Sequence, residues 1–318
     1  MFLRQFEYLV AVAEEQHFGR AAERCHVSQP SLSNGIKQLE LELGVPIVRR
    51  GQRFHGLTAE GWRVAEWARR VIAHRDAMRD ELALMHDNLQ GNLRMGAMPT
   101  CSPVVPMFTQ LLRHRHPGVR ADIQFIGIEA MKVGLGNFSL DVGITYLNEK
   151  DLYKLNSLPI YVERQSLLVP DTEEFRNRTE ITWAEAAELP LALLRKSMHE
   201  RQIVDKAFES VGCEPKPHVE CDTSILHLMF HVMSGALMTI IPGHFALVPG
   251  TFPGTRALDL VDPVISSQVG LIWAEGDPTM PMAKVMVSVV QELQKSGELQ
   301  RKLGDFAVVD KVAAPVDA

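Results

Sequence analysis

The stretch Phe18–Arg53 limits the possible folds more than any other part of the sequence. It contains two short helical patterns around a tight polar break, followed by a basic turn. Ser28 is a good N-cap, and Pro30 falls in the first turn, where its missing N–H group costs little. A helix should therefore begin at about Gln29 and end at Gly44. Its apolar residues have helical spacing: Leu32, Ile36, Leu39 and Leu43. This arrangement predicts a helix-turn-helix whose second helix packs on a small core.

The outward face of this predicted helix carries short hydrogen-bonding side chains near its start and a cation further along: Pro30, Ser31, Ser33, Asn34, Lys37 and Gln38. Groups of this size can enter a major groove and reach base edges. After the helix, Arg49, Arg50 and Arg53 fall in a turn that resembles a short hairpin wing, which could contact phosphates or a minor groove. The alternatives are an amphipathic helix with a solvated outer face and a solvated basic loop.

The bulk charge gives no support to a nucleic-acid partner. The chain has 33 Lys and Arg against 39 Asp and Glu, a formal net charge of -6. Residues 1–58 are almost neutral, with seven basic against six acidic side chains. Any argument for DNA therefore rests on the local basic cluster after the helix.

The same region resembles the amino-terminal signature of the LysR-type transcriptional regulators. The resemblance is carried by Ala21-Ala22, Val27-Ser28-Gln29-Pro30, Ser33, Leu39-Glu40, Leu43-Gly44, Arg50 and Leu57-Thr58-Ala59-Glu60-Gly61. Three features depart from the family pattern. Cys25 stands where leucine is usual, Ile47-Val48 replaces Leu-Phe, and Gly35 lies inside the second helix. Glycine there costs about 1 kcal/mol relative to alanine, which we interpret as a local tolerance.

The resemblance implies an effector-responsive regulator that binds double-stranded promoter DNA. The candidate DNA-binding residues are Gln29, Pro30, Ser31, Ser33, Asn34, Lys37, Arg50 and Arg53. Gln29, Ser31, Ser33 and Asn34 are expected to read bases. Lys37 and Arg53 are expected to contact phosphates or the minor groove.

A long helical pattern without proline follows Thr58 and continues to Gln90, where Gly91 closes it. Two rows repeat every seven residues: Val64, Val71, Met78 and Met85, and Ala68, Arg75, Leu82 and Leu89. Such rows favour a coiled-coil partner, although Arg75 interrupts one of them, and a helix packed on its own domain is the alternative. The resemblance implies a homodimer that assembles further into a tetramer.

Beyond Gly91 the pattern alternates between strands and helices, which indicates parallel sheets covered by helices. Expected strands and helices run from Leu93 to a last long helix, about Met282 to Leu303. The regulatory half of LysR-type proteins is similar to two-lobed periplasmic solute-binding proteins. We therefore expect a winged helix-turn-helix at 1–58, a linker helix at 59–90 and an α/β effector domain at 91–318. Lobe I should comprise about 91–161 and 268–318, and lobe II about 162–267.

An effector is expected outside the carboxyl ends of the strands, near helix N-termini. The first predicted strand leads into Thr100, Cys101 and Ser102. By resemblance this turn contacts the effector, although the hydroxyls of Thr100 and Ser102 could instead simply cap a helix. By resemblance, the remaining effector-binding candidates are Ile128, Thr145, Tyr146, Met198 and His199. Arg195, Lys196 and Arg201 add positive charge nearby, so a small carboxylate or other oxyanion is the expected effector.

Several other functions find no support in the sequence. The paired cysteines of a peroxide-sensing relative are not matched by Cys213 and Cys221, since Met198 and Phe208 fall near those positions. The four cysteines form no zinc spacing, and His227/His231 lacks an evident third ligand, so no metal or cofactor is expected. The sequence contains no hydrolase, P-loop or dinucleotide motif that would indicate an enzyme.

Without a signal peptide or apolar span, the protein should be cytoplasmic. The competing class is a small-molecule-binding protein or enzyme whose amino-terminal helices only mediate assembly.

Overall fold

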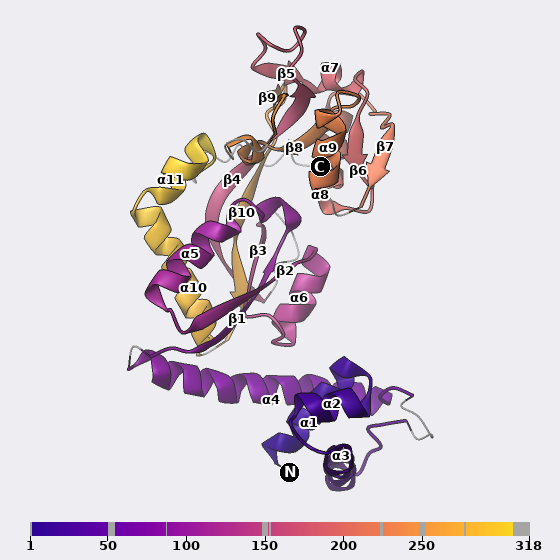
Figure 1. Cartoon of the computed structure of the whole chain (residues 1–318), viewed down its shortest axis with the longest axis vertical. Coiled ribbons are helices and arrows are strands. Elements are labelled where there is room, and N and C mark those ends of the chain that lie inside the picture. Colours follow the sequence, from indigo (N-terminus) through magenta and orange to yellow (C-terminus); the bar gives the residue numbers. More distant parts are fainter. Residues whose placement is uncertain are drawn as a thin grey trace.

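The computed structural model describes residues 2–49, 55–86, 88–147, 152, 154–222, 225–247, 252–276 and 278–307. A small helical unit lies at one end of the molecule, the long helix α4 (Ala59–Leu84) runs from it, and a two-lobed α/β unit occupies the other end (Figure 1). The predicted fold class, a winged helix-turn-helix joined by a linker helix to a two-lobed α/β domain, is confirmed.

The helical unit consists of α1 (Leu3–Glu15), α2 (Phe18–Arg24) and α3 (Gln29–Leu43). The predicted start of α3 is confirmed, because the Ser28 hydroxyl accepts a hydrogen bond from the Ser31 backbone N–H at 3.3 Å. The predicted end is also confirmed, since Gly44 adopts a left-handed conformation with φ 70°. Buried side chains of all three helices and of α4 form one apolar core, with Cys25 packed against it like a small apolar residue.

A glycine is required at position 35 by a contact between two helices, which the sequence did not reveal. A Cβ atom at this position would lie 2.7 Å from the Tyr8 ring of α1, closer than van der Waals contact permits. The glycine therefore lets α1 and α3 approach each other at this point. Interpreting it as a local tolerance was wrong.

The linker helix α4 ends at Leu84, several residues before the predicted end at Gln90. Its first turns belong to the helical unit, since Ala65 and Ala68 are buried in that core. Its last turns face the two-lobed unit, where Ala83 and Leu84 pack against the lobe I core. This helix thus contacts the apolar cores of both units.

The two-lobed unit is built on an eight-stranded mixed sheet among the described residues. The strand order is β2-β1-β3-β10-β4-β9-β5, with β8 also paired to β4. The strands of this sheet are β1 (Gly91–Ala97), β2 (Val119–Phe125), β3 (Val142–Tyr146), β4 (Leu155–Pro170), β5 (Glu180–Thr182), β8 (Thr239–Pro242), β9 (Thr255–Val261) and β10 (Ser266–Ala274). A separate parallel pair comprises β6 (Ala192–Leu194) and β7 (Val219–Cys221).

The long strand β4 belongs to both lobes. Its first half pairs with β10 and its second half pairs with β8 and β9. We define lobe I as β1, β2, β3, β10 and the first half of β4 with their helices, and lobe II as the second half of β4, β5–β9 and their helices. A backbone that crosses between the lobes within one strand can transmit a change in the orientation of one lobe to the other.

Seven α-helices and three short 3-10 segments complete the described part of this unit. The α-helices are α5 (Val105–Arg115), α6 (Ile128–Gly136), α7 (Trp183–Ala187), α8 (His199–Ser210), α9 (Ile225–Met233) and α10 (Pro281–Lys295), and a final short helix, α11 (Glu298–Leu303), follows. The 3-10 segments are η1 (Pro99–Cys101), η2 (Gly243–Leu247) and η3 (Gly304–Ala307). The single helix expected from Met282 to Leu303 is interrupted at Gly297, which has φ 67°. No helix in the described part of the chain is long and apolar enough to cross a membrane.

Candidate nucleic-acid interface and effector cleft

The outward face of α3 presents the side chains predicted to read DNA. Gln29, Pro30, Ser31, Asn34 and Lys37 are exposed, and Ser33 is half-buried. Gln29, Ser33 and Lys37 line an open groove of about 1710 Å³ beside the start of α2. The stripe on the opposite face of α3, which includes Leu32, Ile36 and Leu39, is buried. Packing therefore fixes the helix and leaves its polar face accessible.

The base of the predicted wing is a short antiparallel contact that follows α3. Val48 bridges Leu57, and the Arg49 N–H donates to the Gly56 carbonyl at 3.1 Å. The Glu40 carboxylate accepts from the Ile47 and Val48 amides at 2.7 and 3.0 Å, which ties this base to α3. Arg49 is exposed there. Arg50 and Arg53 lie outside the described residues.

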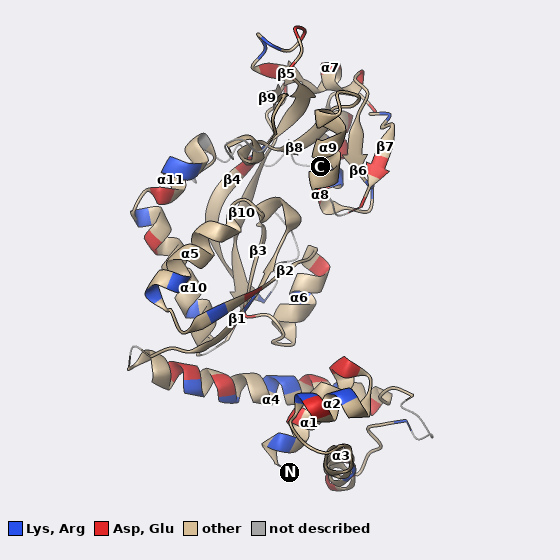
Figure 2. Ribbon diagram, in the orientation of Figure 1, with Lys and Arg blue, Asp and Glu red and all other residues tan. Residues whose placement is uncertain are grey.

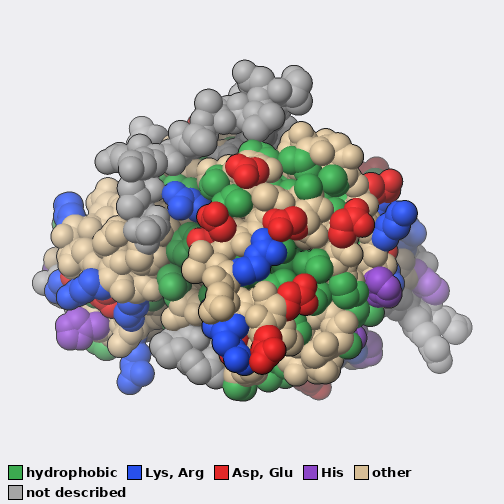
Figure 3. Space-filling view, turned by 90° about the horizontal axis from the view of Figure 1, so that it is seen from above, with side chains coloured by type: hydrophobic (Ala, Val, Ile, Leu, Met, Phe, Trp, Pro, Cys, Tyr) green, Lys and Arg blue, Asp and Glu red, His purple; other side chains and the backbone are tan. Residues whose placement is uncertain are grey.

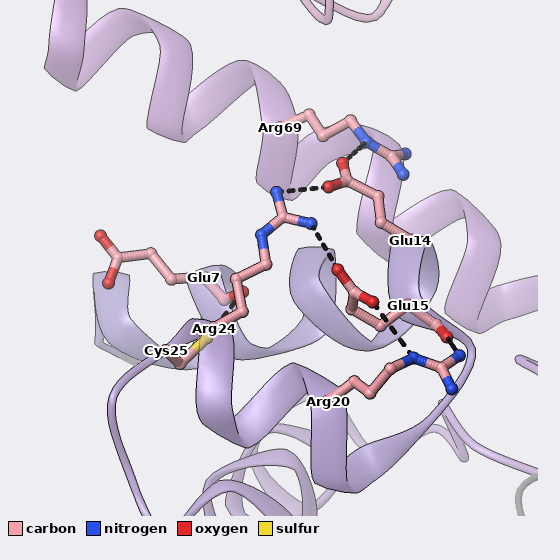
Figure 4. Close-up of polar contacts among 7 residues, drawn as sticks. All are labelled: Glu7, Glu14, Glu15, Arg20, Arg24, Cys25 and Arg69. Carbon is pink, nitrogen blue, oxygen red and sulfur yellow. Dashed lines mark hydrogen bonds and ion pairs between the residues drawn. The ribbon is translucent and has the colours of Figure 1, made fainter.

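Ion pairs hold the helices of this unit in place (Figure 4). Arg24, at the end of α2, pairs with Glu14 of α1 at 2.6 Å and with Glu15 at 3.5 Å. Arg69 of α4 also pairs with Glu14 at 3.5 Å. These cations join helices, whereas Lys37 on α3 and Arg49 at the wing base are exposed among the residues that the structure describes.

The charge distribution explains why composition was uninformative. Basic and acidic side chains occur together along α4 and the helical unit (Figure 2). On the face at the lobe II end of the molecule, Lys and Arg side chains lie among Asp, Glu and hydrophobic ones (Figure 3). The support for DNA binding therefore comes from the geometry of α3 and the wing base, since basic and acidic residues are mixed in the helical unit (Figure 2).

A cleft of about 1030 Å³ opens between the two lobes. Four of the predicted effector residues line it: Ser102, Ile128, Met198 and His199. Ser102 follows η1, Ile128 begins α6, and His199 begins α8 in the facing lobe. The structure thus brings together residues that are far apart in the sequence.

The other four candidates are buried behind this cleft. Thr100 and Tyr146 line a small inner chamber of about 20 Å³. Cys101 and Thr145 are fully buried and line neither space. The Thr145 hydroxyl faces the Met98 sulfur at 3.4 Å, so it contributes to packing inside lobe I.

Polar contacts behind the cleft join the two lobes. Tyr146 of lobe I donates a hydrogen bond to the Glu163 carboxylate on β4, and its ring lies 5.3 Å from that of His199 in lobe II. His244 Nε2 of lobe II lies 3.0 Å from the Thr100 carbonyl of lobe I. Since a carbonyl only accepts, Nε2 carries the proton in this contact.

Burial shifts the pKa values of these groups. It raises the pKa of Glu163 to about 8, and the nearby Glu200 charge contributes to that rise. Desolvation lowers the pKa of His244 to about 4. Burial likewise raises the pKa of the Cys101 thiol to about 12, with the Tyr161 hydroxyl 3.7 Å from its sulfur. At neutral pH all three groups are therefore predominantly uncharged.

The positive charge expected at the cleft is not found there. None of Arg195, Lys196 or Arg201 lines the cleft, and its charged lining within the described ranges is Glu129 and Glu200. Arg201 is buried and its guanidinium pairs with Asp205 at 2.6 Å and Glu220 at 2.7 Å. The prediction that Arg201 supplies positive charge to an effector is therefore wrong, and the lining gives an oxyanion no cationic partner.

Most of the residues that line the cleft were not indicated by the sequence. Among them are large apolar side chains from four separate segments: Phe125, Ile126, Leu226, Met229, Phe245 and Phe252. Their positions depend on how the lobes meet, so no local pattern could identify them. In the described part of the chain, no three His, Cys, Asp or Glu side chains gather into a metal site. All four cysteines are free thiols.

These features define a winged helix-turn-helix protein with a two-lobed ligand-binding domain. Residues 3–62 match the bacterial regulatory helix-turn-helix proteins of the LysR family, and residues 86–295 match the LysR substrate binding domain. The chain therefore belongs to the LysR family. It is a DNA-binding transcriptional regulator with an effector-binding domain.

Individual proteins show the same similarity over nearly the whole chain. The DNA-binding transcriptional dual regulator OxyR of Escherichia coli K12 is 29% identical over 280 residues, which are 87% of this chain and 91% of OxyR. The regulator IlvR of Caulobacter vibrioides is 28% identical over 308 residues, covering 92% of this chain and 98% of IlvR. A full-length OxyR variant from Pseudomonas aeruginosa has 30% identity and a TM-score of 0.72, with coverage of 92% and 98%.

Proposed function

We propose that this LysR-type regulator reads promoter DNA with α3, contacts the flanking backbone with the wing, and changes its DNA complex when an effector enters the interlobe cleft. The single observation that carries the proposal is the exposed polar face of α3 beside a wing base that Glu40 fixes to the same helix. The proposed DNA contacts remain Gln29, Pro30, Ser31, Ser33, Asn34, Lys37, Arg50 and Arg53. The regulator would act on DNA in the cytoplasm, as a regulator and not as an enzyme.

The linker helix supports a dimer. The heptad residues Met78, Leu82 and Met85 are 58%, 54% and 75% exposed, and Trp67 beside them is 60% exposed. Arg75, which interrupts one heptad row, turns back to α1 and pairs with Glu7. A second α4 would cover the exposed row and place two α3 helices on two half-sites of DNA. In this proposal 1–58 and 59–90 serve DNA binding and dimerisation, and 91–318 binds the effector.

Effector binding would act by changing how the lobes sit relative to each other. Both lobes contribute to the cleft walls, and Tyr146–His199 and Thr100–His244 contacts cross between them. An effector that prefers one arrangement of the lobes shifts the population toward it, and α4 connects lobe I to the DNA-binding unit. The effector-contacting residues proposed here are Ser102, Ile128, Met198 and His199, with Thr100 and Tyr146 behind them.

Several relatives are hydrogen peroxide-inducible genes activators, which raises thiol oxidation as a different way of switching. Cys101 directly precedes the cleft residue Ser102 in the sequence and is buried behind the cleft. Burial raises the pKa of its thiol to about 12. Thiols react as thiolates, so such a group is a poor peroxide target. We therefore propose switching by a bound ligand.

A gel-shift assay with the DNA upstream of the protein's own gene tests the proposed function. We expect retardation by the full chain at low salt, and loss of sequence preference in a Ser33→Ala/Asn34→Ala variant. A Glu209→Gln variant, changed on an exposed position of α8 far along the chain, serves as the folding-matched control. Absence of retardation by the unaltered protein would favour the competing class, a lobed ligand-binding protein whose amino-terminal helices only mediate assembly.

A further inference from the structure

The interlobe cleft ends in a chamber that differs from it in size and chemistry. The outer cleft, of about 1030 Å³, is lined mainly by apolar side chains. Glu200 and Ile225 line both this cleft and the inner chamber of about 20 Å³, so the two spaces adjoin. The inner chamber brings together the polar side chains of Thr100, Tyr146, Gln165, Glu200 and Arg201. An effector in the cleft can therefore extend one end into a polar recess.

The volume of the chamber limits that end to a very small group. A cavity needs about 10–15 Å³ to hold one water-sized group. The chamber of about 20 Å³ thus accepts one non-hydrogen atom with its protons, such as an ammonium or a hydroxyl. A carboxylate has three non-hydrogen atoms and does not fit.

The charge around the chamber favours a cation. The Arg201 guanidinium is already compensated by two carboxylates, Asp205 and Glu220, and also donates to the Leu194 carbonyl at 2.6 Å. Glu200 makes no ion pair with any residue that the structure describes, and it is half-buried. The negative charge of Glu200 also acts on the buried Glu163 carboxyl group and helps to raise its pKa. The chamber therefore carries an uncompensated negative charge.

The start of α8 opposes this charge only in part. A helix N-terminus is equivalent to roughly half a positive charge, whereas the carboxylate of Glu200, in the first turn of α8, carries a full negative one. The negative charge of the Glu200 carboxylate is therefore larger than the partial positive charge at the N-terminus of α8.

A buried hydroxyl also lacks a partner there. The Thr100 side chain is fully buried, and its Oγ1 atom has no hydrogen-bond partner among the described residues. A buried hydroxyl without a partner destabilises the protein, so a bound donor at this position is favourable. Gln165 donates through Nε2 toward Glu163 at 3.4 Å, which leaves its carbonyl oxygen to accept. The chamber therefore offers oxygen acceptors from Thr100, Gln165 and Glu200 to one donor with several protons.

We propose that the effector carries a protonated primary amine that enters this chamber beside Glu200, and an apolar body that fills the outer cleft. This inference rests on the proposed function, since it names the chemical class of the effector. An ammonium matches the chamber in size, charge and number of donors. A hydroxyl matches it only in size, and a carboxylate in none of the three.

Isothermal titration of the full chain with three matched probes tests the inference. The probes are 2-phenylethylamine, 2-phenylethanol and phenylacetate, which share an aromatic body and differ in the head group. We expect the amine to bind at least about tenfold more tightly than the alcohol, because charged hydrogen bonds are roughly twice as strong as neutral ones. Phenylacetate should not bind. Equal or tighter binding of the alcohol or of phenylacetate overturns the inference, and so does the absence of amine binding.

Two further measurements assign the binding to the chamber. Glu200→Gln should weaken amine binding about tenfold or more, whereas Glu209→Gln, on an exposed position of the same helix, should leave it unchanged. The unaltered protein should also reject N,N-dimethyl-2-phenylethylamine, whose head group exceeds the chamber. Unchanged binding of the dimethyl probe overturns the inference even where the Glu200 variant fails to fold.

A gel shift of the same preparation separates this inference from the proposed function. If the upstream DNA is retarded but the amine does not bind, the inference about the effector is overturned and the proposed function is not. Amine binding without retardation supports the effector class and contradicts the regulatory role.

Discussion

Replacing Glu163 with glutamine tests the buried polar contacts between the lobes. The Glu163 carboxyl is fully buried on β4, accepts from the Tyr146 hydroxyl, and has an Oε2 atom without a partner in the described structure. Glutamine has nearly the same shape and is uncharged, so Glu163→Gln keeps an oxygen for Tyr146 and removes the titration. The variant therefore isolates the free-energy cost of keeping a carboxyl group at this position.

The sign and size of the effect follow from the pKa of Glu163. Its value rises from 4.5 in the unfolded chain to about 8 in the folded protein. Below pH 4.5 both states hold the proton. Between these values the unfolded chain releases a proton that the folded protein retains, so the Glu163 contribution to stability falls as pH rises. At 1.36 kcal/mol per pH unit, the loss is ~3 kcal/mol at pH 7 and reaches an upper limit of ~5 kcal/mol near pH 8.

Urea unfolding of the two-lobed domain at several pH values measures this difference. We expect the stability of Glu163→Gln relative to the unaltered protein to increase steadily from about pH 5 to about pH 8. His244, whose pKa is lowered, loses its contribution as pH falls below its unfolded value, but this effect is common to both proteins and cancels in the difference. Glu209→Gln, on an exposed position of α8, is the control for replacing a carboxyl group by an amide. A difference that is flat or decreases over this range would refute the reasoning.

Four other expectations concern the remaining parts of the molecule. Gly35→Ala should destabilise the helical unit by about 1–2 kcal/mol in thermal unfolding, because the clash with Tyr8 outweighs the better helix propensity of alanine; an increase in stability would contradict this packing. Lys37→Ala should weaken binding to all DNA sequences and lower the slope of log affinity against log salt by about one, and a change in site preference alone would argue against a phosphate contact. Met78→Glu should raise the dimer dissociation constant at least about tenfold in sedimentation experiments, since a charge would enter the proposed helix pair; an unchanged value would move the interface elsewhere. Cys101 should react with a thiol reagent far more slowly than half-buried Cys213 in the folded protein, and equal rates would restore a redox role.

The helix-turn-helix was predictable because its signals are local. The cap at Ser28, the proline after it and the left-handed glycine at Gly44 each act within a few residues, and the structure places the ends of α3 accordingly. The same local reasoning predicted that strands and helices alternate beyond Gly91, and β1, α5, β2, α6 and β3 of lobe I do so. Gly35 escaped explanation because the Tyr8 ring that requires it comes from another helix.

The parts that the sequence did not predict depend on distant segments. Strand β4 extends from Leu155 to Pro170 across both lobes, because pairing with β10 stabilises its first half despite Pro159. The Arg201 side chain was expected to face an effector, but it pairs with Asp205, one turn further along α8, and with Glu220 of β7, which comes close only in the folded lobe. The proposed base-reading residues Gln29, Ser31, Ser33 and Asn34 share one helix, so local reasoning could place them together, and their contacts with bases remain predictions.

The length of helix α4 determines how far a small tilt at lobe I displaces the DNA-binding unit. With 26 residues and a rise of 1.5 Å per residue, it is roughly 39 Å long. One end is fixed in the core around Ala65 and Ala68, and the other packs on lobe I through Ala83 and Leu84. If the helix stays straight, a tilt of about 5° at lobe I displaces its far end by roughly 3.4 Å, about the spacing between successive base pairs. An angular change too small to alter either core could therefore shift a recognition helix by one step along DNA.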